Sequence, residues 1–322
     1  MNAEAKQDAA EGPLIITPST VGQSTLEALA GWIRSKRELL AREKLSRGAL
    51  VFREFALSTP DDFEVLLTAF GADLLPYDEG LSRREAVRPR IYPTTTYPPH
   101  LVICMHNELC HTWRPPRTLY LFCVVPPATD GQTPITDGRE ILHRLGPTVR
   151  NRFRNRRILY LSSLPSLDHQ PRFGRAWQEV YGTDDRKEIE RILERRSSRC
   201  EWQPDGALRT WSEGPVTVPH PDTGEDVWFN QLLLWHVTNL GPWGQKLRRI
   251  LGEEGVPTNA FFDGGDPIGD KFVNDIRNLM WEERISFDWQ TGDMAVVDNY
   301  RMLHGRNSFS GERLILLAMS AK

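Results

Sequence analysis

The amino-acid sequence predicts a mainly β protein with helical insertions, folded as a double-stranded β-helix of the jelly-roll, cupin-like type. Short apolar, β-prone segments lie towards both ends of the chain, at residues 101–106, 117–125, 294–297 and 314–319. Helical patterns and Pro/Gly-rich turns separate these two groups of segments. Candidate metal ligands occur beside both groups, so a shared site requires the two ends of the β-fold to meet, as they do in a barrel-like sandwich.

The N-terminal region predicts a tail followed by two helices. Residues 1–23 are expected to be a tail. Residues 24–27, Ser-Thr-Leu-Glu, form a capping-box pattern that opens an amphipathic helix to about residue 46, and Gly48 ends it. A strand follows at residues 49–55. A second helix is expected over residues 58–71, with a proline and two aspartates in its first turn.

The rest of the chain is expected to form one domain over residues 24–322. Residues 73–100 are rich in Pro, Arg, Thr and Tyr, which favours an irregular loop near the functional site. The expected elements beyond the 117–125 strand are a helix over 138–154, a charged helix over 183–199, strands and turns over 200–239, and a loop followed by a helix over 257–281.

Composition excludes several classes of function. The 322 residues carry 40 Lys and Arg against 43 Asp and Glu, a formal charge of −3, so we expect no nucleic-acid partner and no membrane attachment. No apolar run approaches the roughly 18–20 residues that span a bilayer, and the polar N-terminus has no signal-peptide pattern. The four cysteines, without a Cys-x-x-Cys pair, suggest reduced thiols and a cytoplasmic location.

The sequence His106-Asn107-Glu108 follows an apolar run and is the strongest candidate for a metal site. In an extended strand, positions i and i+2 point the same way, so His106 and Glu108 would project together while Asn107 faces the other side. One imidazole and one carboxylate are two of the three ligands of the 2-His-1-carboxylate triad of non-heme Fe(II) oxygenases. His-x-Glu alone is also common by chance at strand ends.

The C-terminal region supplies the missing imidazole. His304 follows the β-prone run 294–297, and Arg313 stands directly before the apolar segment 314–319. Burying an arginine without a partner is expensive, so Arg313 should either be paired or have a functional role.

These motifs resemble the taurine dioxygenase (TauD/TfdA-like) family of Fe(II)- and 2-oxoglutarate-dependent oxygenases. The shared pattern is His-x-Glu, then Gly131-Gln132-Thr133, then Asp298-Asn299 with His304-Gly305-Arg306, and finally Gly311-Glu312-Arg313. Within the family the sequence is most similar to the branch typified by the syringomycin β-hydroxylase, which acts in nonribosomal peptide and antibiotic biosynthesis. The likeness extends from about residue 48 to 319 and includes residues 177–182, 220–225 and 229–231.

The resemblance implies a role for each motif. His106, Glu108 and His304 would hold Fe(II) and leave three coordination positions open for 2-oxoglutarate and O2. Arg313 would bind the distal carboxylate of 2-oxoglutarate through its guanidinium fork, assisted by the hydroxyl of Thr133. Arg306 is a weaker candidate for anion contact, with a structural ion pair as the alternative.

The carboxylate at position 108 bears on the reaction. Related halogenases have a small residue there, which leaves room for chloride, so Glu108 predicts oxygen insertion rather than halogenation. The resemblance then implies hydroxylation of an unactivated C–H bond coupled to conversion of 2-oxoglutarate into succinate. Epoxidation, desaturation or ring closure at the same iron site are alternatives. A zinc hydrolase or a non-redox jelly-roll metal-binding protein would leave Arg313 and Thr133 without a role.

The expected substrate is a small molecule of the amino-acid type, either free or tethered to a peptidyl carrier protein. Asn230, in a Phe-Asn-Gln motif of the branch, is a candidate for substrate or outer-shell contact. Two departures from the branch, Cys110-His111-Thr112 after the glutamate and Asp130-Gly131 before the threonine, predict that the substrate differs from those of known relatives.

Overall fold

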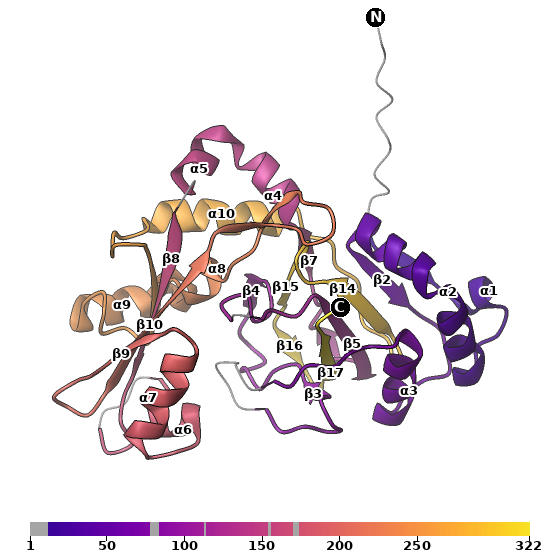
Figure 1. Ribbon diagram of the computed structural model, residues 1–322, viewed down its shortest axis with the longest axis horizontal. Helices are drawn as coiled ribbons and strands as arrows, with labels where there is room; N and C mark the ends of the chain where they lie inside the picture. The colour runs from indigo at the N-terminus through magenta and orange to yellow at the C-terminus, as the bar shows by residue number, and fades with distance from the viewer. Residues whose placement is uncertain (1–11, 78–83, 113, 154–155, 170–173) are drawn as a thin grey trace, which may run out of the picture.

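The largest sheet of the protein joins strands from the two ends of the chain. The computed structural model describes residues 12–77, 84–112, 114–153, 156–169 and 174–322 (Figure 1). All pairs in the sheet are antiparallel except β1 with β2. The six strands, in spatial order, are β1 (Leu14–Ile16), β2 (Ala49–Phe52), β14 (Met294–Asp298), β5 (Thr118–Val125), β17 (Leu314–Ser320) and β3 (Tyr92–Pro93).

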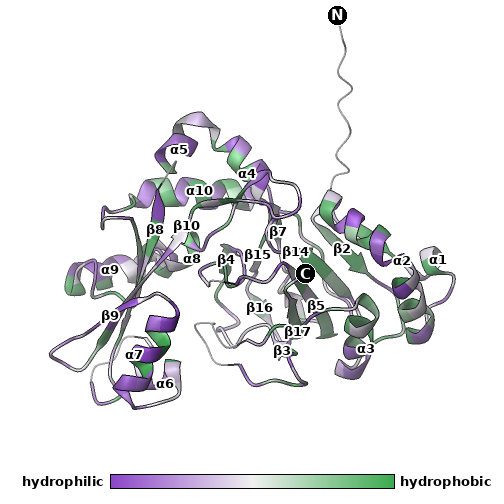
Figure 2. Cartoon of the chain, viewed as in Figure 1, coloured by the Kyte–Doolittle hydropathy of each residue, from purple (hydrophilic) through white to green (hydrophobic). Residues whose placement is uncertain are grey.

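Both faces of this major sheet are buried. Alternate residues of β2 separate to opposite faces: Leu50 and Phe52 pack against two helices, α2 (Leu26–Arg47) and α3 (Pro60–Phe70), whereas Val51 faces the second layer of strands. The apolar colour of β5 and β14 in Figure 2 reflects this double burial. At roughly 25 cal/mol per Å2 of buried apolar surface, such a core is the main stabilising contribution to the fold.

The predicted helix boundaries near the N-terminus are confirmed, and the predicted tail is partly wrong. Thr25 caps α2 by accepting a hydrogen bond from the backbone N–H of Ala28, and Gly48 ends the helix with φ 79°. Residues 14–21, however, are not a tail: β1 pairs with β2, the short helix α1 (Pro18–Val21) follows, and Ile16 is 1% exposed. The folded domain therefore includes these residues. Residues 1–11 lie outside the described part.

A second, smaller layer completes the jelly roll. The minor sheet has the order β4 (Ile103–His106), β15 (Met302–Arg306) and β7 (Ile135–Asp137), and a separate two-stranded sheet pairs β6 (Thr129–Asp130) with β16 (Phe309–Ser310). Met302 and Ile135 pack with the facing side chains of the major sheet. Residues from the two chain ends thus lie on neighbouring strands, as the predicted fold class requires.

The long segment between β7 and β14 adds a further antiparallel sheet. Its order is β13 (Thr258–Phe262), β8 (Arg157–Leu164), β10 (Leu208–Pro215) and β9 (Arg199–Trp202), with a separate hairpin of β11 (Thr217–Pro219) and β12 (Asp226–Trp228). The strands expected over 200–239 are present, whereas the sequence patterns did not indicate the other two strands of this sheet, β8 and β13. Met105 and Leu303 of the minor sheet pack with Trp228 of this insertion. The minor sheet therefore lies between the major sheet and the insertion (Figure 1).

Helices surround the insertion, and two of their predicted boundaries differ from the structure. The helix expected over 138–154 is broken at Gly146, which has φ 69°, and the expected loop after residue 257 begins with β13. The helices are α4 (Gly138–Arg144), α5 (Gly146–Phe153), α6 (Trp177–Tyr181), α7 (Arg186–Arg195), α8 (Leu232–Trp235), the 3-10 helix η1 (Val237–Leu240), α9 (Gly241–Leu251) and α10 (Asp270–Glu282). Within the described residues, none is long and apolar enough to cross a membrane.

Candidate metal centre and cosubstrate pocket

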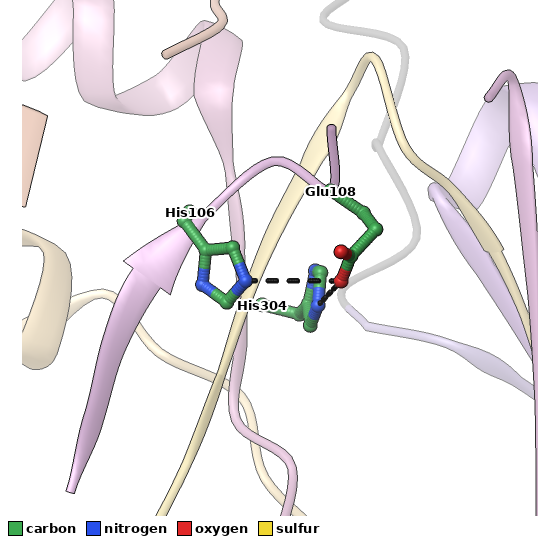
Figure 3. Close-up of side chains that lie close together, drawn as sticks. All are labelled: His106, Glu108 and His304. Carbon is green, nitrogen blue, oxygen red and sulfur yellow. Dashed lines mark ion pairs between the residues drawn. The ribbon is translucent and has the colours of Figure 1, made fainter. Parts of the chain in front are cut away.

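The structure brings the three predicted metal ligands together at the junction of β4 and β15. His106 and His304 are directly opposite each other in the antiparallel register, and their ring centroids are 4.5 Å apart. Oε2 of Glu108 lies 3.5 Å from Nε2 of His304 and 3.9 Å from Nε2 of His106 (Figure 3). The candidate ligand atoms of all three residues lie within 4.8 Å of one another.

Glu108 reaches this position from a turn rather than from a strand. β4 ends at His106, so the side-chain alternation used in the sequence argument does not extend to Glu108. The turn is instead held by Asn299, whose Oδ1 accepts the backbone N–H of Glu108 (2.8 Å) and whose Nδ2 donates to the Glu108 carbonyl (3.0 Å) and the Pro116 carbonyl (2.8 Å). This buried amide fixes the direction of the carboxylate.

Asn107 lies on the opposite side, as predicted, and anchors the metal-binding turn to the insertion. Its side chain is fully buried and donates to the Asn299 carbonyl at 2.7 Å. Its Oδ1 accepts the backbone N–H of Asn230 at 3.2 Å, and Gln231 donates to its carbonyl. The ligand turn is therefore tied to both the major-sheet side and the insertion side of the fold.

The pKa shifts of Glu108 and His304 suit the binding of a divalent cation. Burial alone would raise the pKa of Glu108, but the neighbouring imidazoles of His106 and His304, followed by the charge of Arg84, lower it to well below its usual range. Burial, together with the charge of His106, lowers the pKa of His304. Nδ1 of His106 lies 2.8 Å from the Cys104 carbonyl, which can only accept, so Nε2 carries the free lone pair.

Arg313 and Thr133 form a second cluster beside the candidate metal centre. Nη2 of Arg313 donates to Oγ1 of Thr133 at 3.2 Å, and Nε1 of Trp289 donates to the same oxygen at 3.1 Å. Nε of Arg313 donates to the Gly131 carbonyl. Burial and the nearby charge of Arg306 lower the pKa of Arg313 to about 10. An anion bound here would offset the free-energy cost of burying the positive charge of Arg313.

The β-sheet register connects the two clusters. Thr133 lies two residues before Ile135 of β7, and Ile135 is the register partner of His304 on β15. Arg313 lies directly before β17, on the neighbouring major sheet. A dicarboxylate held by Arg313 and Thr133 is thus placed beside the strand that carries a candidate metal ligand.

The two weaker sequence candidates occupy structural positions. The Nη atoms of Arg306 donate to the carbonyls of Tyr97, Pro98 and Leu101 at 2.6–2.8 Å, which favours a structural role, with carbonyl partners in place of the expected ion pair. Asn230 is 2% exposed, and its side chain donates to the Val216 carbonyl. Its backbone N–H donates to Oδ1 of Asn107, the neighbour of two candidate metal ligands, which favours the outer-shell interpretation over substrate contact.

Two features near the centre were not singled out from the sequence. The hydroxyl of Tyr77 donates to Oε1 of Glu108 at 3.3 Å, and the guanidinium of Arg84 stacks on the Tyr77 ring at 3.8 Å. Both residues belong to the 73–100 segment, which was expected to be a loop near the site. Residues 78–83, between them, lie outside the described part of the chain.

Two other histidines have the structural roles that their contexts suggest. His220 accepts backbone hydrogen bonds from Asp222 and Thr223 through Nδ1 and contacts Asp298 through Nε2, so it fixes its loop. His236 is 2% exposed and hydrogen-bonds the Ile268 carbonyl.

Comparison with known proteins identifies the family. The model of the "Taurine catabolism dioxygenase TauD, TfdA family" matches residues 16–319. The dapdiamide synthesis protein DdaC of Enterobacter agglomerans is 32% identical over 85% of this chain and 82% of its own length. A clavaminate synthase-like protein of Arabidopsis thaliana is 27% identical over 95% of this chain and 93% of its own length.

Solved structures support the fold. PvcB of Pseudomonas aeruginosa matches with a TM-score of 0.55 and 13% identity, covering 99% of this chain and 94% of its own. A putative α-ketoglutarate-dependent taurine dioxygenase from Burkholderia xenovorans matches with a TM-score of 0.52 and 16% identity, covering 89% of this chain and 83% of its own. The expected double-stranded β-helix is thereby confirmed. The chain belongs to the TauD, TfdA family and is an Fe(II)- and 2-oxoglutarate-dependent dioxygenase.

Proposed function

We propose that this dioxygenase hydroxylates an unactivated C–H bond of an amino acid or an amino-acid-like molecule in natural-product biosynthesis. The observation that carries the proposal is the pairing of a His106–Glu108–His304 triad with the buried Arg313–Thr133 cluster. The relatives named for dapdiamide synthesis and for likeness to clavaminate synthase support a biosynthetic role. The syringomycin-type branch within the family stays a prediction.

Each residue of the site has a defined task in this proposal. His106, Glu108 and His304 hold Fe(II), and Arg313 with Thr133 holds the distal carboxylate of 2-oxoglutarate. When bound, Fe(II) and 2-oxoglutarate supply the activation of O2 that C–H oxidation needs. The three ligand side chains are 6–9% exposed in the absence of any ligand, so few water molecules can reach the centre once substrate covers it.

Glu108 supports hydroxylation over halogenation, because its carboxylate takes the coordination position that a halide would need. The Asn299 side chain accepts a hydrogen bond from the backbone N–H of Glu108, and the Tyr77 hydroxyl donates to the Glu108 carboxylate. Both contacts keep the carboxylate in this position. Epoxidation, desaturation and ring closure use the same ligands and are the alternative outcomes. The mass of the product separates these outcomes into two pairs, since hydroxylation and epoxidation add one oxygen, whereas desaturation and ring closure remove two hydrogens. NMR of the product then separates the members of each pair.

The test is succinate formation with Fe(II), ascorbate and 2-oxoglutarate, screened against free amino acids and against carrier-bound aminoacyl groups. We expect one class to stimulate succinate formation and to yield a product with one added oxygen. The variants His106→Ala and Arg313→Ala should abolish the stimulation. Exposed residues provide matched controls, His143→Ala and Arg88→Ala, which should retain it.

The two substrate classes give separate answers. Stimulation by carrier-bound groups alone would place the enzyme with a peptidyl carrier protein, whereas stimulation by free amino acids would remove the need for one. Succinate formation that none of these compounds stimulates would contradict the amino-acid assignment. A loss of activity in the control variants equal to that in His106→Ala and Arg313→Ala would contradict the assigned residues.

A further inference from the structure

Arg84 is a second cationic side chain beside the candidate iron centre, distinct from the cosubstrate arginine. Its guanidinium carbon lies 3.8 Å from the centroid of the Tyr77 ring, and the hydroxyl of that ring donates to Oε1 of Glu108 at 3.3 Å. The positive charge of Arg84 also acts on both Glu108 and His304. Arg84 is therefore one side chain removed from a metal ligand.

The hydrogen-bonding capacity of Arg84 is largely unused. Its Nη1 donates to the Pro93 carbonyl at the long distance of 3.5 Å, and its buried Nε has no hydrogen-bond partner among the described residues. Among the described residues, no carboxylate lies within 4 Å of its guanidinium, although many surface arginines of the chain, such as Arg88 with Asp61, form such pairs. A partly buried guanidinium with free donors is a site prepared for an anion.

The charge balance of the loaded centre leads to the same conclusion. Fe(II) brings two positive charges and 2-oxoglutarate two negative ones, and Glu108 is offset by Arg313. Within the described part of the chain, Arg84 then remains as a positive charge without an ion-pair partner, and Arg306 adds another on the Arg313 side. Charge of one sign at a partly buried site is costly, so a substrate that carries a negative charge binds more favourably than a neutral one.

We propose that Arg84, stacked on Tyr77, binds a carboxylate of the substrate and orients it over the iron centre, so that the substrate is a free acid. This inference rests on the proposed oxygenase function and refines its substrate class. A carboxylate fits the planar fork of an arginine through two parallel hydrogen bonds. A thioester on a carrier protein has no such group at that end, so the inference favours free substrates over tethered ones.

The experiment compares each L-amino acid of a panel with its own carboxamide and with its carrier-bound thioester. Succinate formation is measured with the wild type and with the variants Arg84→Gln, Arg84→Lys and Arg88→Gln. Arg88→Gln is the matched control, since it removes the same charge from the same segment at a surface ion pair with Asp61. Anaerobic formation of the visible band of the Fe(II)–2-oxoglutarate complex shows, for each variant, that the centre is loaded.

The wild type and Arg88→Gln should prefer the acid over the carboxamide in kcat/KM. Arg84→Gln should lose this preference roughly 10- to 100-fold through a higher KM for the acid, as expected for a lost hydrogen bond to a charged group. Arg84→Lys, which keeps the charge but not the fork, should lose less. A purely structural role of Arg84 would impair acid and amide turnover equally.

Several results would overturn the inference. These are equal use of acid and amide by the wild type, turnover of thioesters alone, a retained acid preference in Arg84→Gln, or a loaded centre that turns over no acid of the panel. Absence of the visible band in the wild type would instead refute the proposed function itself. The two failures are thereby distinguishable.

Discussion

Asn299 is the residue through which the fold most directly positions a metal ligand, and its replacement by alanine is the sharpest test of the site's construction. The side chain is fully buried and makes three hydrogen bonds of 2.8–3.0 Å, two to the backbone of Glu108 and one to the Pro116 carbonyl. Asn299→Ala leaves one buried N–H and two buried carbonyls without this partner.

The expected cost follows from those three bonds. Each contributes about 1 kcal/mol net, so Asn299→Ala should lower the free energy of unfolding by about 3 kcal/mol. The freed turn no longer fixes the Glu108 carboxylate, and removal of such an outer-shell partner typically weakens metal binding by roughly 10- to 100-fold. The variant should therefore lose both stability and Fe(II) affinity.

A second buried asparagine separates the two effects. Asn259 lies in β13 of the insertion, is 1% exposed, and makes hydrogen bonds to the backbone of Val237, Ala260 and Glu253 rather than to a candidate metal ligand. Asn259→Ala should lower the free energy of unfolding by an amount similar to that in Asn299→Ala, without changing the Fe(II) affinity. Both quantities are measurable by urea denaturation of the apo protein and by anaerobic Fe(II) titration. Unchanged iron affinity in Asn299→Ala, or an equal loss in Asn259→Ala, would refute the reasoning.

Three further predictions address the surroundings of the site. In Gly305→Ala the added Cβ would lie 2.7 Å from the Ile103 carbonyl and push β15 from β4, so stability should fall by about 1–3 kcal/mol in thermal or urea unfolding, with weaker iron binding. Tyr77→Phe removes one 3.3 Å hydrogen bond to Glu108, so the Fe(II) Kd should rise only about 5-fold in anaerobic titration. Burial lowers the pKa of His236 below its usual 6.5, so the folded state resists protonation; stability should fall as pH decreases below about 6.5, and a pH series of urea midpoints should be flatter for His236→Gln.

The clustering of the three candidate iron ligands could be predicted from the sequence because iron chemistry restricts the residue types and the motif fixes their order. His106, Glu108 and His304 form one cluster, as predicted, and Thr133 lies against Arg313. The route to Glu108 was less predictable. Its side chain faces the histidines because Asn299 holds a turn, a long-range contact that strand periodicity does not encode.

Other parts of the structure depend on tertiary contacts that leave little local pattern. The strand β1 is only three residues long, and it is recognisable as a strand only because β2 lies beside it. Gly146 ends one helix and begins the next within a segment that reads as continuously helical. Arg84 lies in a segment without periodicity, so its proximity to Tyr77 and Glu108 becomes evident only in three dimensions.

The central claim, that this chain loads Fe(II) and 2-oxoglutarate at the His106–Glu108–His304 and Arg313–Thr133 clusters, is tested most directly by anaerobic spectroscopy. Addition of 2-oxoglutarate to the Fe(II) protein should produce a visible metal-to-ligand absorption band. His106→Ala should abolish the band. Arg313→Gln should raise the 2-oxoglutarate concentration that gives half of the maximal band by roughly 10- to 100-fold, as expected for loss of a charge-assisted hydrogen bond. A wild-type protein that binds Fe(II) but shows no band, or a band unaffected by both substitutions, would contradict the account.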